Sequence, residues 1–272
     1  MSVLSTQRLQ CLISQIEGKN VLVTGASSGI GAATSLLYAK AGANVVLAAR
    51  RAEKLEEIVK QARELNPRGN YEAVNLDISK REEINQFFQR TSFKAFDILV
   101  NNAGLVKGLE EVGSINDDDV DTMFDTNVIG LIKLTQIFVN HFKERNAGHV
   151  VNLGSIAGLE PYQRGSIYCS TKHAVRSFTS SLMKELVGTP IRVSEVEPGL
   201  VETEFSVVRF RGDKEQADNV YKDLDPLTPE DIAEEIIWIT SRPPHVQVAN
   251  TLVFPTNQAS AGIVARPGKS NN

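Results

Sequence analysis

The sequence predicts an α/β protein: a single Rossmann-type, doubly wound parallel sheet of about seven strands flanked by helices. Short runs of β-branched and aliphatic residues alternate along the chain with longer segments of amphipathic, helical spacing, which is the order of elements in such folds. Some of the short runs, such as Val21–Val23 and Val45–Leu47, are apolar throughout. Continuous apolar character indicates strands covered on both faces, as in parallel sheets.

Seven short runs are the expected strands, and each is followed by turn residues or a helical segment. They are Asn20–Thr24, Asn44–Ala48, Tyr71–Asn75, Asp97–Asn101, Gly148–Leu153, Ile191–Val196 and Thr251–Phe254. Helical spacing between them predicts helices at Glu53–Ala62, Phe124–Phe142, Ser166–Val187 and Pro229–Thr240.

No internal repeat or change of composition divides the 272 residues, and α/β folds of this length often form one unit. We therefore expect a single domain over residues 1–272. One long connection, Gly199–Pro226, follows the sixth expected strand and mixes charged residues, aromatic residues and glycine. Such connections commonly cover a site, so residues 199–226 are predicted to form a substrate lid and are called the lid below.

The composition argues against several classes of function. The net charge is −4 and no block of Lys and Arg occurs, which disfavours nucleic-acid binding. No apolar run approaches the roughly 18 residues of a membrane helix. The two cysteines, Cys11 and Cys169, fit a reducing compartment, and no signal peptide is recognisable, so a cytoplasmic location is expected. No cluster of His, Cys and acidic residues has the spacing of a metal site, so no metal is expected.

A glycine-rich turn follows the first expected strand and opens a helical segment. Glycine lets the backbone approach a pyrophosphate closely, and the N–H groups of the helix N-terminus can bind it. The spacing G-x-x-x-G-x-G differs from the standard dinucleotide motif and from a Walker A loop; the alternative is an ordinary turn. The residues of this turn predicted to bind the cofactor are Gly25, Ser27, Ser28, Gly29, Ile30 and Gly31.

Two arginines, Arg50 and Arg51, end the second expected strand. An acid at this place would bind the ribose 2′-hydroxyl of NAD, whereas guanidinium groups suit a 2′-phosphate. The sequence therefore favours NADP(H). The alternative is that both arginines are solvated surface residues.

Two further segments lie at expected strand ends, where cofactors bind in such sheets. Asp77 follows the third strand and is predicted to reach the adenine, although an Asp there can equally cap the next helix. Asn102, Ala103 and Gly104 follow the fourth strand and are predicted to line the cofactor cleft. The alternative for this second segment is a simple turn.

Tyr168 and Lys172 lie four residues apart, so in a helix they share one face. A phenol has an ordinary pKa of about 10, and a nearby ammonium is expected to lower the pKa of Tyr168 and favour the phenolate. Ser155, just after the fifth expected strand, is placed to polarise a substrate oxygen. A Tyr and a Lys at this spacing are by themselves also common on surface helices.

Taken together, these motifs resemble the short-chain dehydrogenase/reductase family in order and spacing. The motifs are Thr24–Gly31, Asn101–Gly104, Asn127, Ser155, Tyr168, Lys172 and Pro198–Gly199, and the resemblance covers residues 18–255. The family is one of NAD(P)-dependent oxidoreductases, so the resemblance implies hydride transfer between a nicotinamide and a hydroxyl or carbonyl substrate.

The resemblance also implies roles for individual residues. Tyr168 is similar to the general acid/base, Lys172 to the residue that lowers its pKa and holds the nicotinamide ribose, and Ser155 to the hydroxyl that orients the reacting oxygen. Asn127 resembles a helix-interrupting asparagine that holds a relay water. The residues that resemble those contacting the carboxamide are Pro198, Gly199, Val201 and Thr203. Without the resemblance, Asn127 and Thr203 are equally explained as capping or loop residues.

A narrower resemblance is to the NADP-dependent serine and 3-hydroxy acid dehydrogenases, carried by Ser155–Gly158, Glu197–Phe210 and Leu227–Asp231. It implies a small substrate such as L-serine or L-allo-threonine and a homotetramer. A carboxylate substrate needs a cation, and Arg209 in the lid is the chosen candidate, with pairing to a neighbouring acid as the alternative.

Three functions remain open from the sequence. The first is an NADP-dependent dehydrogenase of a small 3-hydroxy acid. The second is an NADPH-dependent reductase of a bulkier carbonyl, such as a 3-oxoacyl thioester, a sugar or a xenobiotic ketone. The third is a nucleotide-binding protein without catalysis, which the presence of both Tyr168 and Lys172 disfavours.

Overall fold

A computed structural model describes residues 15–266, so that Cys11 lies outside the described residues. One sheet of seven parallel strands runs through it in the order β3-β2-β1-β4-β5-β6-β7. The strands are β1 Asn20–Thr24, β2 Asn44–Ala49, β3 Tyr71–Asn75, β4 Ile98–Asn101, β5 Gly148–Leu153, β6 Ile191–Pro198 and β7 Asn250–Val253. All seven predicted strands are confirmed, with bounds that shift by one or two residues.

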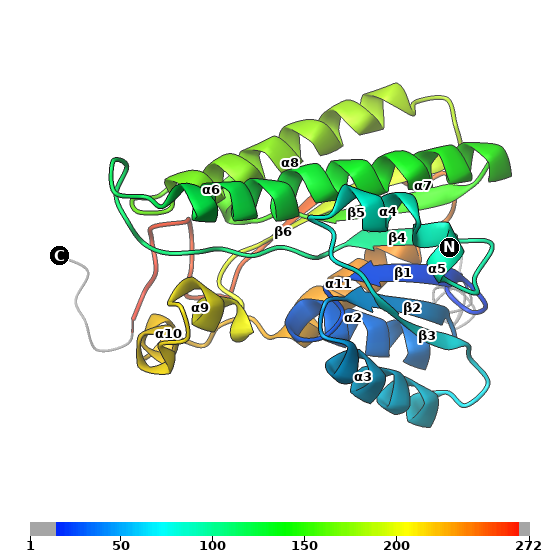
Figure 1. Cartoon of the computed structure of the whole chain (residues 1–272), viewed down its shortest axis with the longest axis horizontal. Coiled ribbons are helices and arrows are strands. Elements are labelled where there is room, and N and C mark those ends of the chain that lie inside the picture. The colour runs from blue at the N-terminus through cyan, green and yellow to red at the C-terminus, as the bar shows by residue number, and fades with distance from the viewer. Residues whose placement is uncertain (1–14, 267–272) are drawn as a thin grey trace, which may run out of the picture.

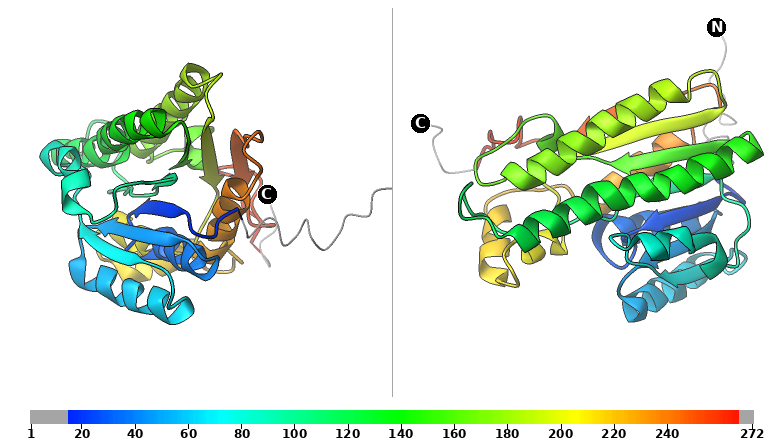
Figure 2. Two further views of the ribbon diagram at one scale, coloured as in Figure 1. Left: turned by 90° about the vertical axis from the view of Figure 1, so that its right-hand side faces the viewer. Right: turned by 45° about the horizontal axis from the view of Figure 1, so that its top comes forward.

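Helices cover both faces of this sheet (Figures 1 and 2). One face is covered by α2 Gly29–Lys40, α3 Ala52–Leu65 and α11 Pro229–Thr240, and the other by α4 Arg81–Asn85, α5 Phe87–Arg90, α7 Leu131–Arg145 and α8 Ser166–Glu185. Successive residues of a strand point to opposite faces of the sheet, so each strand contributes side chains to both cores. Val21 and Val23 of β1 pack toward α2, whereas Leu22 packs toward α7. The doubly wound fold expected from the sequence is therefore confirmed.

The span predicted as a helix, Phe124–Phe142, is helical throughout, but it changes from α- to π-helical geometry in its first part. Helix α6, Asp117–Phe124, is followed by a π-helical segment at Asp125–Gly130 and then by α7. Gly130 packs against the backbone of Ile78 so closely that a Cβ there would lie 2.2 Å from the Ile78 carbonyl oxygen. A wide turn is tolerated here because tertiary packing outweighs the local helical preference.

The lid contains two short helices, α9 Glu204–Arg209 and α10 Lys214–Tyr221. They lie at one end of the sheet, apart from both helical layers (Figure 1). The Tyr221 hydroxyl, near the end of α10, lies 2.8 Å from the carbonyl oxygen of Val201 and 2.7 Å from the Ser206 hydroxyl. These two hydrogen bonds join the end of α10 to the first residues of the lid. The lid therefore contains more helix than its mixed composition suggests.

No helix within residues 15–266 has the length and apolarity needed to cross a membrane. Across the same range, no group of three or more His, Cys, Asp or Glu side chains is arranged to hold a metal ion.

Candidate active site

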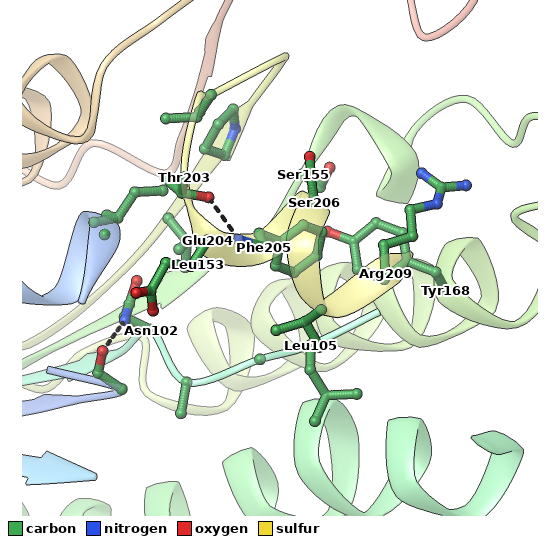
Figure 3. Close-up of a pocket in the computed structure, with 18 of the residues that line it drawn as sticks. Asn102, Leu105, Leu153, Ser155, Tyr168, Thr203, Glu204, Phe205, Ser206 and Arg209 are labelled. Atoms are coloured by element: carbon green, nitrogen blue, oxygen red, sulfur yellow. Dashed lines mark hydrogen bonds between the residues drawn. The ribbon is translucent and has the colours of Figure 1, made fainter. Parts of the chain in front are cut away.

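A cavity of about 670 Å³ opens at the carboxyl ends of the strands, between the sheet and the lid. Parallel sheets of this kind place ligands at this edge. Every residue predicted from the sequence to bind cofactor or substrate lines the cavity except Gly31, and every predicted catalytic residue does except Asn127. Figure 3 shows Ser155, Tyr168 and Arg209 around it.

The turn after β1 has the geometry expected of a phosphate site. Gly25 and Gly29 have φ angles of 66° and 54°, which side chains rarely adopt. Gly31 faces inward, where a Cβ would lie 2.4 Å from the Gly25 carbonyl oxygen. Ser28, the N-cap of α2, makes no side-chain capping hydrogen bond. The first N–H groups of this 12-residue helix are therefore available to an anion.

Arg51 lies across this turn. Its guanidinium donates to the hydroxyl of Ser27 at 3.0 Å and to that of Ser28 at 2.6 Å, and it pairs with the Glu204 carboxylate at 2.8 Å. Lys54 also binds Glu204, at 2.9 Å. Hydrogen bonds from Lys54 and Arg51 lower the pKa of Glu204 to about 2. Arg50 is exposed at the rim of the same cavity.

The side chains of Asp77 and Asn102 both form hydrogen bonds that stabilise the segments after their strands. The Asp77 carboxylate accepts from the Ser79 backbone N–H at 3.0 Å and from its hydroxyl at 2.7 Å. It therefore stabilises a turn and is not the helix cap considered for it, because α4 begins only at Arg81 with Lys80 as its N-cap. Asn102 donates to the Thr24 carbonyl at 2.8 Å and thereby joins the ends of β4 and β1 (Figure 3). Both residues still line the cavity.

Tyr168 is buried on α8, and its ring meets that of Phe205 edge-on with centroids 5.5 Å apart. Burial raises the pKa of Tyr168 above the ordinary value for a phenol, and a hydrogen bond with Ser155 offsets part of this. The expectation that Lys172 lowers this pKa is wrong for the protein alone. Desolvation dominates, because the phenolate would be poorly solvated in the buried site.

The Lys172 ammonium makes no hydrogen bond to the Tyr168 hydroxyl. It donates to the Leu153 carbonyl at 2.7 Å and lies 5.9 Å from the centre of the Tyr168 ring. Burial lowers the pKa of Lys172 to about 8, and the charge of Glu195 opposes that shift. At neutral pH the side chain is therefore mainly an ammonium, held beside Tyr168 on one face of α8.

Asn127 lies in the π-helical segment, and both N–H groups of its amide are bonded to protein groups. Its Oδ1 accepts from the Leu105 N–H at 2.8 Å, and its Nδ2 donates to the Leu105 carbonyl at 2.8 Å and to the Thr171 hydroxyl at 3.1 Å. The side chain thus fixes the segment after Gly104, which forms one wall of the cavity, to α8.

Thr203 caps α9 by accepting from the Phe205 N–H at 3.2 Å, as Figure 3 shows. The capping explanation therefore holds for its hydroxyl, although Thr203 still lines the cavity. Pro198, Gly199 and Val201 precede it along the same wall. Gly199 meets the side chains of Gln258 and Phe254 so closely that a Cβ there would lie 2.3 Å from Gln258 Oε1.

Arg209 reaches into the cavity from the end of α9. Its Nη1 donates to the Tyr162 hydroxyl at 3.2 Å, and its Cζ lies 5.3 Å from the centre of the Tyr162 ring. No carboxylate among the described residues pairs with it, whereas its neighbour Arg211 pairs with Glu110 and Asp119. The acid-pairing alternative considered for Arg209 is therefore not what the structure contains.

The sequence analysis did not single out two groups near the site, Glu195 and Tyr162. Glu195 is buried on β6, and burial raises its pKa to about 7. Its charge within the predicted strand Ile191–Val196 was the available hint. Tyr162 lies in the segment before α8, where nothing local distinguishes a wall residue from a surface one.

Comparison with known proteins agrees with this geometry. Residues 19–214 match the family model described as short chain dehydrogenase. The chain belongs to the short-chain dehydrogenase family. The identification as an oxidoreductase is therefore confirmed.

Similar short-chain dehydrogenases include one from Schizosaccharomyces pombe named NADP-dependent 3-hydroxy acid dehydrogenase, 48% identical over 93% of this chain and 99% of that protein. The serine 3-dehydrogenase of Rhizobium radiobacter is 39% identical over 89% of this chain and 96% of its own. A solved structure described as the closed form of serine dehydrogenase complexed with NADP+ has a TM-score of 0.85 and 38% identity, covering 91% of this chain and 99% of that one.

Proposed function

We propose that this protein is an NADP-dependent dehydrogenase that transfers a hydride between NADP(H) and a small 3-hydroxy acid such as L-serine or L-allo-threonine. The observation that carries the proposal is the position of Arg209. A guanidinium without a carboxylate partner lies in the same cavity as the Ser155 and Tyr168 hydroxyls, so one small substrate can meet all three. The names of the similar proteins from yeast and bacteria support it.

The residues present fit NADP(H). We assign the diphosphate to the turn of Gly25–Gly31 and the N-terminus of α2, and the 2′-phosphate to Arg51 with Arg50 beside it. The available helix N–H groups and the serine-bound guanidinium supply positive potential there. When bound, the cofactor supplies the hydride acceptor or donor. The remaining assigned contacts are Asp77, Asn102, Ala103, Gly104, Lys172, Pro198, Gly199, Val201 and Thr203, all of which line the cavity.

The proton chemistry is assigned to Tyr168. During carbonyl reduction its Oη donates a proton to the substrate oxygen, and during alcohol oxidation the same oxygen accepts that proton. The raised pKa of Tyr168 keeps the phenol protonated at neutral pH in the protein alone, which suits the donor role. Ser155 holds the substrate oxygen beside it, Lys172 supplies positive charge, and Asn127 keeps the wall after Gly104 in place.

A bulkier carbonyl substrate is the second candidate. Apolar side chains contribute part of the cavity wall, among them Leu105, Leu109, Phe205 and Val208. Such a surface suits a longer acyl chain or a ketone. The Arg209 guanidinium, which can pair with a substrate carboxylate, still favours the small acid as the better substrate.

The decisive experiment measures NADPH formation by the full-length protein with L-serine and with other 3-hydroxy acids, beside a panel of neutral alcohols. Tyr168→Phe removes the proton carrier and is expected to lower kcat at least a hundredfold while NADPH binding is retained. Thr122→Ala is the control, because Thr122 is half-buried on α6, its hydroxyl donates to the Asp118 carbonyl, and it does not line the cavity. Turnover of neutral alcohols only would assign the second candidate, and unchanged turnover by Tyr168→Phe would exclude Tyr168 as the acid/base.

We also propose a cytoplasmic location, one domain over residues 1–272, lid closure by residues 199–226, and a homotetramer. The continuous sheet supports the single domain. A composition suited to a reducing compartment supports the cytoplasmic location. The tetramer follows from resemblance. A monomer by light scattering would exclude it.

A further inference from the structure

The Arg209 guanidinium is held along one edge only. Nη1 donates to the Tyr162 hydroxyl, and the guanidinium lies over the Tyr162 ring at 5.3 Å. Its Nε is buried and has no acceptor among residues 15–266. Nη2 also has no acceptor among these residues, but it is not buried. Its N–H groups are therefore the donors that a carboxylate in the cavity can reach.

Arg209 is half-buried, and a charge that is partly removed from water is stabilised by a nearby anion. Two neighbouring arginines have such partners: Arg211 pairs with Glu110 and Asp119, and Arg51 pairs with Glu204. Arg209 lacks such a partner among the described residues and interacts electrostatically with Tyr168 instead. The missing anion is therefore best supplied from the cavity.

Tyr162 belongs to the fixed wall of the cavity rather than to the lid. It packs against the buried cluster that contains Leu105, Tyr168 and Cys169. Gly165 leaves room for its ring, since a Cβ there would lie 2.2 Å from a ring carbon. Tyr162 thus connects the α8 side of the cavity, which carries the reacting phenol, with the arginine that the lid contributes.

We propose that Tyr162 is a positioning residue for substrate selection: by holding Nη1, it directs Nη2 of Arg209 towards the substrate carboxylate. This inference rests on the proposed 3-hydroxy acid activity. It assigns the preference for an acid over a neutral alcohol of the same size to the pair of Tyr162 and Arg209. The Tyr162 hydroxyl contributes direction, and its ring supports the guanidinium by a cation–π contact.

The test compares 3-hydroxybutanoate with its methyl ester as substrates of the full-length enzyme with NADP. Tyr162→Phe keeps the ring and removes the hydroxyl. It is expected to raise KM for the acid roughly three- to tenfold, the effect of one lost hydrogen bond, and to change kcat less than about twofold. Arg209→Ala is expected to raise KM for the acid by roughly tenfold to a hundredfold. Both variants are expected to use the ester as the parent does.

Tyr71→Phe is the matched control, because the Tyr71 hydroxyl bonds to the Asn66 carbonyl at 3.1 Å and is remote from the cavity. An unchanged ratio of acid to ester use in Tyr162→Phe, with a reduced ratio in Arg209→Ala, would overturn the role of Tyr162 and leave the proposed function standing. An unchanged ratio in both variants would overturn the inference together with Arg209 as anchor. Equal use of acid and ester by the parent would contradict the acid preference itself.

Discussion

At the scale of single residues, the charge of Lys172 depends on a neighbour outside the cavity. Glu195 lies on the face of β6 toward α8, and its Oε1 is buried without a hydrogen-bond partner. Gly154 lies directly over it, since a Cβ there would be 2.4 Å from that oxygen. The groups facing it are Lys172 and Arg176 from α8 and Glu197 from β6. Glu195 is the charged group that raises the pKa of Lys172 against burial.

We therefore expect Glu195→Gln to lower the pKa of Lys172 from about 8. If the ammonium is required, the alkaline limb of kcat/KM for carbonyl reduction moves to lower pH, by roughly half a unit to one unit. The measurement is a pH–rate profile with NADPH. Glu185→Gln, exposed at the end of α8, is the control and should leave the profile unchanged. A limb that moves to higher pH would contradict the assignment.

At the scale of elements, α7 anchors one helical layer to the sheet through an aromatic cluster. The ring of Phe138 lies 5.5 Å from that of Phe87, 5.2 Å from that of Phe96 and 5.7 Å from that of Phe142, measured between centroids. Phe138, Phe87 and Phe96 have no exposed surface. Close packing leaves no room for the neighbours to collapse into a vacated volume.

We expect Phe138→Ala to lower the free energy of unfolding by about 3–5 kcal/mol, through lost burial and the cavity left behind. Urea denaturation followed by circular dichroism measures it. Asn140→Ala, on the exposed side of the same helix, should stay within about 0.5 kcal/mol of the parent. Equal midpoints for the two variants would mean that the cluster does not stabilise this layer.

At the scale of the whole molecule, the cofactor site is assembled from segments far apart in the chain. Arg51 follows β2, the serines it binds follow β1, and Glu204 belongs to the lid some 150 residues later. Because Glu204 and a 2′-phosphate would use the same guanidinium, cofactor binding and lid position are linked through Arg51.

We expect Arg51→Ala to raise the dissociation constant of NADPH by roughly tenfold to a hundredfold, the effect of losing charge-assisted hydrogen bonds, and that of NADH much less. Fluorescence titration of the reduced cofactors measures both. Arg68→Ala removes an exposed arginine from the α3–β3 turn and controls for net charge. Equal weakening of both cofactors would show that Arg51 does not read the 2′-phosphate.

The sequence by itself determined the parallel sheet, the phosphate turn and the identity of the reacting groups. Parallel strands covered on both faces were indicated by continuous apolar runs such as Val21–Val23, and glycine at 25 and 29 was required by local backbone geometry. These features depend on short stretches of chain, where periodicity and conformational limits act directly.

Only the tertiary structure decided the pKa values of the buried side chains and the residues that they contact. Tyr168 has a raised pKa because the fold buries it, although the Tyr168–Lys172 spacing had predicted the opposite. Arg209 meets Tyr162 rather than an acid, and the helix through Phe124–Phe142 takes π-helical geometry at Asp125–Gly130. Desolvation and contacts between distant segments depend on all the surrounding elements at once, so local pattern could not contain them.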